Sequence, residues 1–152
     1  MLQAALSSFV SQGYHSTNLE QIAATAHLTK GAIYFNFGSK EAVLLELLKR
    51  VQTVVVDEAI RVVEARRGSF ADRLVAYIHY QAGLGLTRRD EVLLLILMSL
   101  EFKERQGKVH SFIQKLNKRQ CTLSSPLSRP GRPRASAGRI FARERSAPSS
   151  GR

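Results

Sequence analysis

Two lysines stand where the first turn of a helix is expected, an unfavourable place for a positive charge. Lys30 opens one short helical pattern, and Lys40 follows directly after the break at residues 38–39. The N-terminal end of a helix carries a partial positive charge and free amide groups, so it attracts anions rather than cations. A lysine beside those amides is favourable when an anion is bound there as well. The two positions therefore point to phosphate binding, with a solvated surface lysine as the alternative for Lys40.

Several residues between these lysines could contact a nucleic acid. Gly31 costs a helix about 1 kcal/mol relative to Ala, but a missing side chain lets a phosphate or base edge approach the backbone closely. Tyr34, Phe35 and Asn36 are candidates for the outward face of this helix. An asparagine can bind adenine through both atoms of its amide. A buried position is the alternative for Phe35.

These residues belong to the second of two short helical patterns that almost touch in sequence. Apolar residues recur at helical spacing over residues 19–26 and again over residues 29–37. Only His27 and Leu28 remain for the turn, and histidine is among the residues that tolerate a positive φ. Two short helices joined by a tight turn form a helix-turn-helix, whose second helix can enter the major groove of DNA.

Thr17 and Glu20 have the spacing of a capping box at the start of the first short helix. The threonine hydroxyl would accept a hydrogen bond from the amide of Glu20, and the carboxylate would reach back. A cap needs no ligand, so this spacing alone does not make Thr17 a DNA contact.

Further segments stand at fixed distances around this pair of helices. They are A-A-L-x-x-F at residues 4–9, G-Y at 13–14, Thr17 with I-A at 22–23, and T-K-G-A-I-Y-F-N-F-G-S-K-E-A at 29–42. In this combination, the first 48 residues resemble the TetR/AcrR family of transcriptional regulators. The family most often has glycine where this chain has His27. It usually has a few more residues before the first helix, so DNA binding should be weaker if Met1 is the true start.

The resemblance implies a three-helix DNA-binding domain over residues 1–45, with the helix-turn-helix over about residues 18–37. It implies that Thr17 and Lys40 contact the DNA backbone, that Tyr34 donates to a phosphate, and that Asn36 makes a polar contact. The complete set of expected DNA-binding residues is Thr17, Thr29, Lys30, Gly31, Ala32, Tyr34, Phe35, Asn36 and Lys40.

Helical spacing continues beyond residue 40. Apolar residues from 42 to 63 predict a helix over about residues 39–66, roughly 42 Å long, which could link two domains. Patterns over residues 70–86, 92–102 and 109–116 follow, and they predict a helical ligand-binding and dimerisation domain over residues 46–116. Four larger side chains could line a ligand pocket between the helices, or could be plain core: Tyr77, Tyr80, Met98 and Phe102.

The composition changes at about residue 117, where Ser, Pro, Arg, Gly and Ala become dominant. Such a segment cannot bury enough apolar surface to offset the entropy of ordering, so residues 117–152 are expected to be a disordered tail. The TetR/AcrR family usually continues with two helices that form the dimer interface, so the helical domain looks incomplete, as after a frame shift or a replaced end. We still expect self-association through residues 92–100 and 109–116, whose apolar surface would otherwise be exposed.

Composition limits the class of protein. The chain has 152 residues and a net charge of +11, but residues 117–152 hold nine basic residues and one acidic residue, a net charge of +8. The charge therefore reports mostly the tail and is no evidence that the folded part binds nucleic acid.

The single cysteine, Cys121, excludes an internal disulfide and a cysteine metal cluster. No secretion signal is found and the longest apolar run, residues 92–98, cannot span a bilayer, so we expect a cytoplasmic protein without membrane contact.

The sequence thus predicts an all-α protein, with no metal and no cofactor. The resemblance implies a sequence-specific transcriptional regulator, a repressor released by an unknown small-molecule inducer. It would act as a homodimer on a palindromic operator in double-stranded DNA. Two alternatives stay open: a truncated interaction protein that pairs with a full-length relative and has no DNA function of its own, or a non-specific nucleic-acid binder acting through the basic tail. An enzyme is not indicated, because the four histidines are scattered and no hydrolase, phosphate-loop, dinucleotide or zinc-protease motif occurs.

Overall fold

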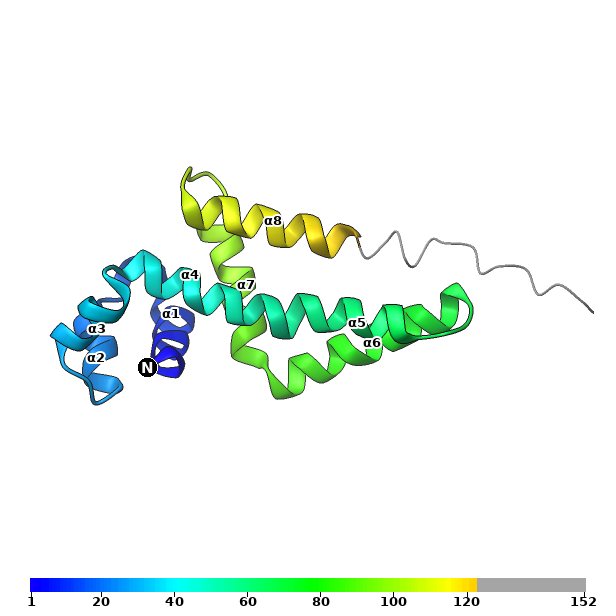
Figure 1. Cartoon of the computed structure of the whole chain (residues 1–152), viewed down its shortest axis with the longest axis horizontal. Helices are drawn as coiled ribbons and strands as arrows, with labels where there is room; N and C mark the ends of the chain where they lie inside the picture. The colour runs from blue at the N-terminus through cyan, green and yellow to red at the C-terminus, as the bar shows by residue number, and fades with distance from the viewer. Residues whose placement is uncertain (123–152) are drawn as a thin grey trace, which may run out of the picture.

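The computed structural model describes residues 1–122 and is built from helices over that range (Figure 1). The elements are α1 (Leu2–Ser16), α2 (Leu19–Thr25), α3 (Lys30–Phe37), α4 (Lys40–Val51), the π-helix η1 (Gln52–Asp57), α5 (Glu58–Ala65), α6 (Phe70–Thr87), α7 (Arg89–Glu101) and α8 (Lys108–Thr122). The expected all-α architecture is confirmed.

The first three helices form a small bundle at one end of the molecule (Figure 1). Phe9 of α1, Ile22 of α2 and Ile33 of α3 are each at most 1% exposed, and they share one core cluster with Leu44 of α4. The apolar stripes predicted for these short helices therefore face inward. Burial of these stripes, rather than helix propensity, stabilises helices this short.

A nearly continuous helical run from Lys40 to Ala65 connects this bundle to the other helices (Figure 1). Its extent agrees with the predicted helix over about residues 39–66, but residues 52–57 form a π-helix. Three consecutive valines lie there, and β-branched side chains crowd the preceding turn of an α-helix. The wider π-turn shifts the backbone hydrogen bonds from i+4 to i+5. The hydroxyl of Tyr80 in α6 donates to the carbonyl of Val54 in this segment, at 2.5 Å.

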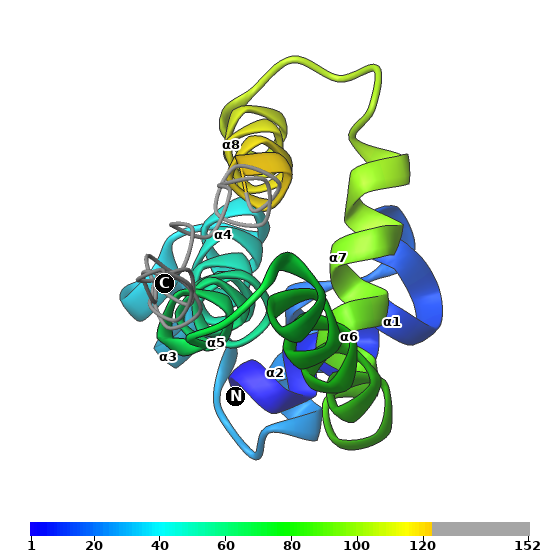
Figure 2. The same cartoon turned by 90° about the vertical axis from the view of Figure 1, so that its right-hand side faces the viewer.

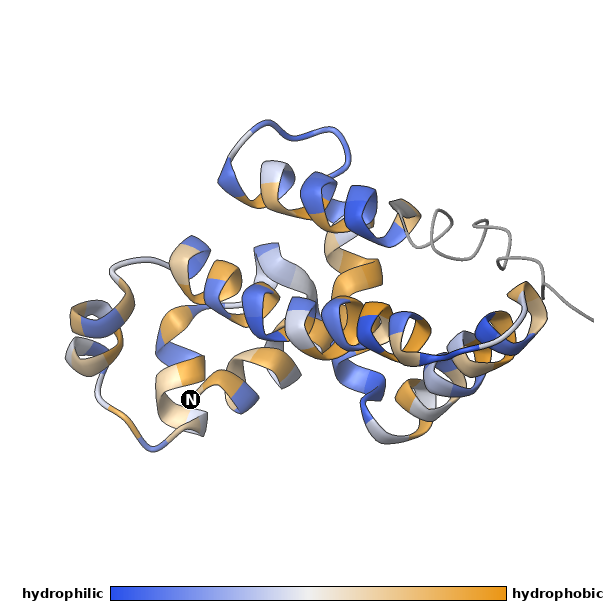
Figure 3. Cartoon of the chain, turned by 45° about the vertical axis from the view of Figure 1, so that its right-hand side comes forward, coloured by the Kyte–Doolittle hydropathy of each residue, from blue (hydrophilic) through white to orange (hydrophobic). Residues whose placement is uncertain are grey.

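The later helices surround the long run. α6 returns alongside α5, α7 packs on α1, and α8 lies along α4 and η1 (Figures 1 and 2). Figure 3 shows α8 with an apolar side toward the long run and a hydrophilic side away from it. Val109, Ile113 and Leu116 are at most 3% exposed in this contact. The expectation that residues 109–116 present an apolar surface for self-association is therefore wrong, because the chain's own helices cover it.

The predicted boundary at residue 117 lies inside α8, which continues to Thr122. Arg119 forms an ion pair with Asp57 at the end of η1, with the two atoms 3.0 Å apart. The buried first half of α8 and this tertiary contact extend the helix beyond the point where the composition changes. The expectation of a disordered tail otherwise concerns residues 123–152, which lie outside the described residues.

Of the four side chains suggested for a ligand pocket, Met98 and Phe102 are buried in the core, and Tyr77 and Tyr80 are half-buried at its edge. Met98 is fully buried, and Phe102 packs edge-on against Tyr14, with ring centres 5.1 Å apart. Tyr77 and Tyr80 of α6 pack on a small cluster in α5. These contacts between neighbouring helices agree with the plain-core alternative, and a role in ligand binding stays a prediction.

Over residues 1–122, no helix combines the length and the apolar character needed to cross a bilayer. In the same range, no group of three or more His, Cys, Asp and Glu side chains is arranged to hold a metal ion.

Candidate nucleic-acid interface

The turn between α2 and α3 is held by backbone hydrogen bonds and one left-handed residue. The amide of His27 donates to the carbonyl of Ala24 at 3.1 Å, and that of Leu28 donates to Ala23 at 2.9 Å. His27 has a φ of 54°, the only positive φ of a non-glycine residue in the described part of the chain. Histidine therefore adopts the conformation for which glycine is more usual, and the two helices join with almost no intervening chain.

The outward side of α3 is accessible to a large partner. Phe35 is 91% exposed and Tyr34 is 42% exposed, whereas their neighbour Ile33 is 1% exposed. The alternative of a buried Phe35 is wrong, because the turn directs Ile33 to the core. A phenyl ring that is this exposed adds little to the stability of the free chain and is available for contact with another molecule.

The start of α3 is also open. The hydroxyl of Thr29 accepts a hydrogen bond from the amide of Ala32, at 3.2 Å, and so caps the helix. The nearest atom to the place that a Cβ would occupy on Gly31 is this same hydroxyl oxygen, 4.0 Å away. No group from residues 1–122 fills the space beside Gly31, so a partner's backbone can approach there.

Lys30 has an anion beside it within the chain. Its ammonium group forms an ion pair with Glu20 of α2 at 2.5 Å, and it lies 5.7 Å from the ring centre of Tyr34. The hydrogen bond with Lys30 lowers the pKa of Glu20, and the same bond raises the pKa of Lys30. Both side chains are exposed, where such a pair contributes little to stability. Lys30 can therefore exchange this carboxylate for a phosphate group.

Asn36 uses part of its hydrogen-bonding capacity on its own helix. Its amide nitrogen donates to the carbonyl of Ala32, at 2.7 Å. The amide oxygen and the second N–H are left for a partner, so the side chain offers a base fewer groups than a free asparagine would.

Thr17 is not at the surface. It is 1% exposed. Its hydroxyl donates to the carbonyl of Gly13 at 2.6 Å, and the carbonyl of Ser8 is a second acceptor at 3.2 Å. The cap of α2 is Asn18, whose side chain accepts from the amides of Glu20 and Gln21. The predicted capping box is wrong. Gly13, with a φ of 78°, interrupts α1 and leaves a carbonyl that the threonine hydroxyl satisfies. A hydroxyl buried in this way cannot reach a phosphate.

Lys40 is held inside the chain as well. Its ammonium group donates to the carbonyls of Tyr14 and Thr17 at 2.7 Å and of His15 at 3.2 Å. It also lies 4.5 Å from the ring centre of Tyr14. The last carbonyls of a helix lack partners within the helix, and a lysine can satisfy them. In the free chain, Lys40 therefore holds the connection between α1 and α2 rather than an external anion.

Three of the expected residues come together beside this connection. A cleft of about 490 Å³ has Thr17, Tyr34 and Lys40 in its lining, together with the two cap residues Asn18 and Ser39. Tyr34 thus faces the starts of two helices, where backbone amides favour an anion.

Glu101 belongs to this region, although no pattern in the sequence indicates it. Its carboxylate accepts hydrogen bonds from the amides of Tyr14 at 3.0 Å and His15 at 3.2 Å, and lies 3.2 Å from Nε2 of His15. Burial raises the pKa of Tyr14, and the charges of Glu41 and Glu101 add to this. The end of α1 is therefore held on its amide side by α7 and on its carbonyl side by Lys40 of α4.

An outward α3, a connection of only four residues after α2, and a supporting α1 define a helix-turn-helix domain. Residues 1–47 match the sequence model of the family described as bacterial regulatory proteins, tetR family. This part of the chain is therefore similar to that family, and the resemblance to TetR/AcrR regulators is confirmed.

Known relatives are similar over the same region. The uncharacterised HTH-type transcriptional regulator YuxN of Bacillus subtilis (strain 168) is 44% identical over 48 residues, which are 32% of this chain and 16% of YuxN. The HTH-type transcriptional regulator RutR of Escherichia coli (strain K12) is 41% identical over 51 residues, 34% of this chain and 24% of RutR. The matches thus span a quarter or less of these two relatives.

Similarity of structure extends further along the chain. The crystal structure of the MbdR regulator from Azoarcus sp. CIB superposes with a TM-score of 0.74 and 35% identity, over 83% of this chain and 65% of MbdR. The helices after the DNA-binding domain therefore follow the fold of a known regulator.

Proposed function

We propose that the protein is a sequence-specific DNA-binding regulator of transcription, with α3 in the major groove. The observation that carries this proposal is the 91% exposure of Phe35 on a helix that follows α2 after only four residues. An apolar side chain in the major groove can contact the methyl group of thymine, and Asn36 can add a polar contact to a base. Lys30 and Tyr34 lie at the edge of the same helix and are suited to phosphate.

The proposal changes the role of two residues. Lys40 and Thr17 support DNA binding from inside, because they fix the end of α1 against α2. Thr29, Gly31 and Ala32 at the start of α3 provide a cap and an open backbone rather than a charge.

A second cleft in the protein could bind a small molecule that controls DNA binding. It has a volume of about 490 Å³ and lies among η1, α6, α7 and α8. Its apolar lining comprises Val55, Val92, Leu95, Ile96 and Leu100, and Gln81 and Ser99 are among its polar residues. This volume and lining suit a small, mostly apolar ligand.

The same cleft is connected to the DNA-binding domain through α7. Leu95 and Ser99 line the cleft, and Glu101 at the end of that helix holds the amides of Tyr14 and His15. A ligand that displaces α7 would shift the end of α1 and so the orientation of α3. We propose that the ligand releases DNA in this way, which makes the protein a repressor.

We propose that two copies act together on a palindromic site. Two recognition helices on one face of the duplex lie about 34 Å apart, and binding both half-sites raises the affinity. Ile96 and Leu100 on α7 line the edge of the ligand cleft, and because they are 51% and 68% exposed, their outward parts are also available for contact with a second copy.

The test begins with selection of DNA from a random pool, followed by fluorescence anisotropy on the selected duplex. We expect a palindromic sequence and an affinity that falls as salt is raised. Lys30→Gln should reduce the salt dependence by roughly one unit for each phosphate that the lysine neutralises, on all sequences alike. Binding without sequence preference would favour a non-specific binder acting through its basic residues. No binding would favour an interaction protein without a DNA function.

A further inference from the structure

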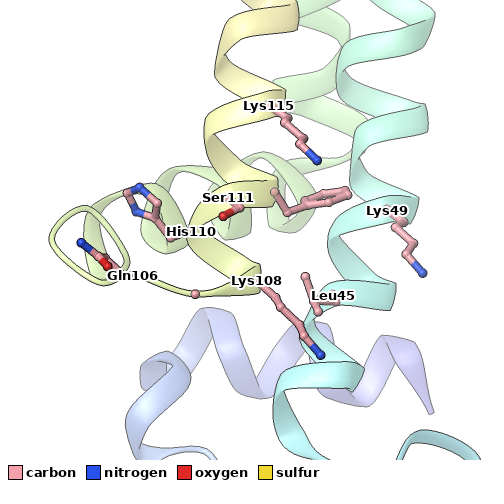
Figure 4. A pocket seen from close by; sticks show the side chains of 9 residues that line it. Leu45, Lys49, Gln106, Lys108, His110, Ser111 and Lys115 are labelled. Carbon is pink, nitrogen blue, oxygen red and sulfur yellow. The ribbon is translucent and has the colours of Figure 1, made fainter.

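A third cleft lies on the side of α4 that faces α8, apart from both sites described above. Its volume is about 910 Å³, and its wall is formed by α4, the start of α8 and the loop before it. Figure 4 shows Lys108 and Lys115 extending from α8, Leu45 on α4, and Gln106 on the loop. We call this the α4–α8 cleft.

The polar lining of the α4–α8 cleft is positive. Lys49, Lys108 and Lys115 are part of it, and no Asp or Glu of the described residues is. Lys49 pairs with Glu46 at 2.9 Å, outside the lining. Neither Lys108 nor Lys115 has an ion-pair partner among residues 1–122. Three ammonium groups around one concavity, two of them unpaired in this range, attract an anion.

The floor of the cleft is apolar. Leu45 and Phe112 are only partly buried and belong to the edge of the hydrophobic core. Phe112 stands between Lys108 and Lys115 in the sequence of α8, and the two lysines are two helical turns apart, a rise of about 10 Å. A ligand that lies across the floor can therefore cover the ring of Phe112 and still meet an ammonium group.

Other polar groups complete the lining. Ser111 presents a hydroxyl from the middle of the cleft wall (Figure 4). Nδ1 of His110 lies 2.8 Å from the carbonyl of Phe102, to which it donates. This bond fixes the imidazole ring of His110 at the side of the cleft, so Ser111 and the lysines are the groups that can bind a ligand.

We propose that the α4–α8 cleft binds an organic anion with an apolar body, such as a medium-chain carboxylate. The charged group lies between Lys108 and Lys115, and the apolar body covers Leu45 and Phe112. An inorganic anion would leave the apolar floor in water, and a neutral apolar molecule would leave the ammonium groups without a counter-charge. This site is separate from the apolar cleft among η1, α6, α7 and α8, and its occupation does not require DNA.

The test uses the free chain and sodium octanoate, followed by two-dimensional NMR of the backbone amides. We expect octanoate to shift the amides of Leu45, Ser111 and Phe112. The double substitution Lys108→Gln with Lys115→Gln should weaken octanoate binding about ten-fold, as the removal of one charge-assisted hydrogen bond does. Titration with 1-octanol and with inorganic phosphate should give binding at least about ten-fold weaker than octanoate.

The matched control is Lys103→Gln with Lys118→Gln, which changes the net charge by the same amount at two exposed lysines outside the cleft. Its affinity for octanoate should stay within about two-fold of the unmodified chain. Circular dichroism confirms that both variants are folded. Equal weakening in both pairs, equal binding of phosphate or 1-octanol, or shifts confined to residues 92–100 would each overturn the proposal. Because DNA is absent from the experiment, failure here leaves the regulator function untouched, and success does not depend on it.

Discussion

At the scale of single residues, Lys40 illustrates how a cation beside a helix start can serve the chain itself. Its three N–H groups meet the carbonyls of Tyr14, His15 and Thr17. We expect Lys40→Met to lower the free energy of unfolding by about 1–3 kcal/mol, because the variant has no charged donor for carbonyls that stay partly buried. Urea denaturation followed by circular dichroism measures this decrease.

Lys49→Met is the control for Lys40, because Lys49 lies on the same helix and makes one exposed ion pair. It should change the free energy of unfolding by less than about 0.5 kcal/mol. A direct phosphate contact by Lys40 would give a different result. The variant Lys40→Met would then keep its stability, and the salt dependence of its DNA binding would be reduced.

Substitution of Phe35 should affect DNA binding but not stability, whereas substitution of Lys40 should affect stability. Phe35→Ala should leave the free energy of unfolding within about 0.5 kcal/mol of the unmodified chain, because the ring is 91% exposed. The same change should weaken binding to the selected DNA about ten-fold, if the ring contacts a base.

The neighbouring substitution Ile33→Ala provides the contrast, since Ile33 is 1% exposed. It should cost about 2–5 kcal/mol of unfolding free energy. An unchanged affinity of Phe35→Ala for DNA would remove Phe35 from the interface, and a large decrease in stability would show that the ring packs on the chain.

The residue scale also marks the limit of sequence-based inference. The exposure of Tyr34 and the left-handed His27 follow from local spacing, and both are predictable. The contacts of Lys40 and Glu101 cannot be predicted from local spacing. Lys40 binds Thr17, which is 23 positions away in the sequence, and Glu101 binds Tyr14, which is 87 positions away. The role of Thr17 is not predictable either. The irregular turn at Gly13 leaves a carbonyl without a helical partner, and the hydroxyl of Thr17 donates to it. The spacing of a capping box gives no indication of this contact.

At the scale of elements, the π-helix η1 depends on a tertiary contact. The O–H of Tyr80 meets the carbonyl of Val54, and burial raises the pKa of this phenol, with the charge of Glu58 adding to the effect. Tyr80→Phe should lower the free energy of unfolding by about 1–2 kcal/mol, because the carbonyl no longer has its donor. Amide exchange should accelerate in residues 52–57 before it does in α4.

Tyr77→Phe is the matched control, since the hydroxyl of Tyr77 accepts from the side chain of Gln81 on the same helix, at 2.9 Å. It should leave exchange in η1 unchanged. Equal effects of the two substitutions would show that the hydroxyl of Tyr80 does not support the π-helix.

Element boundaries are predictable where an apolar stripe and a breaker coincide, as in the long run ending near residue 66. The π-helix at residues 52–57 is not predictable from the sequence. Three consecutive valines indicate steric crowding in an α-helix, but they do not indicate that the backbone adopts a π-helix there. The end of α8 is unpredictable for a related reason. Composition changes at residue 117, but the ion pair of Arg119 with Asp57 is a tertiary contact.

At the scale of the whole molecule, the exposed apolar side chains of α7 are candidates for contact with a second copy. Ile96 and Leu100 lie one turn apart on α7 and are 51% and 68% exposed. We expect this face to join two copies, because residues 109–116 are already covered and exposed apolar groups in one patch favour association. Sedimentation should therefore show a dimer at micromolar concentration.

The pair Ile96→Glu with Leu100→Glu should convert that dimer to a folded monomer, because four carboxylates would face one another across the contact. The control pair Ile78→Glu with Leu86→Glu makes the same change on α6, at residues that are 53% and 88% exposed, and should leave the dimer intact. Leu97 is unsuitable for this test, because it packs partly against the core and its substitution would report folding. The α7 variant should bind a single half-site as the unmodified chain does, without the gain in affinity on the palindrome. A monomeric unmodified chain, or dissociation by the α6 pair alone, would place the contact elsewhere or remove it.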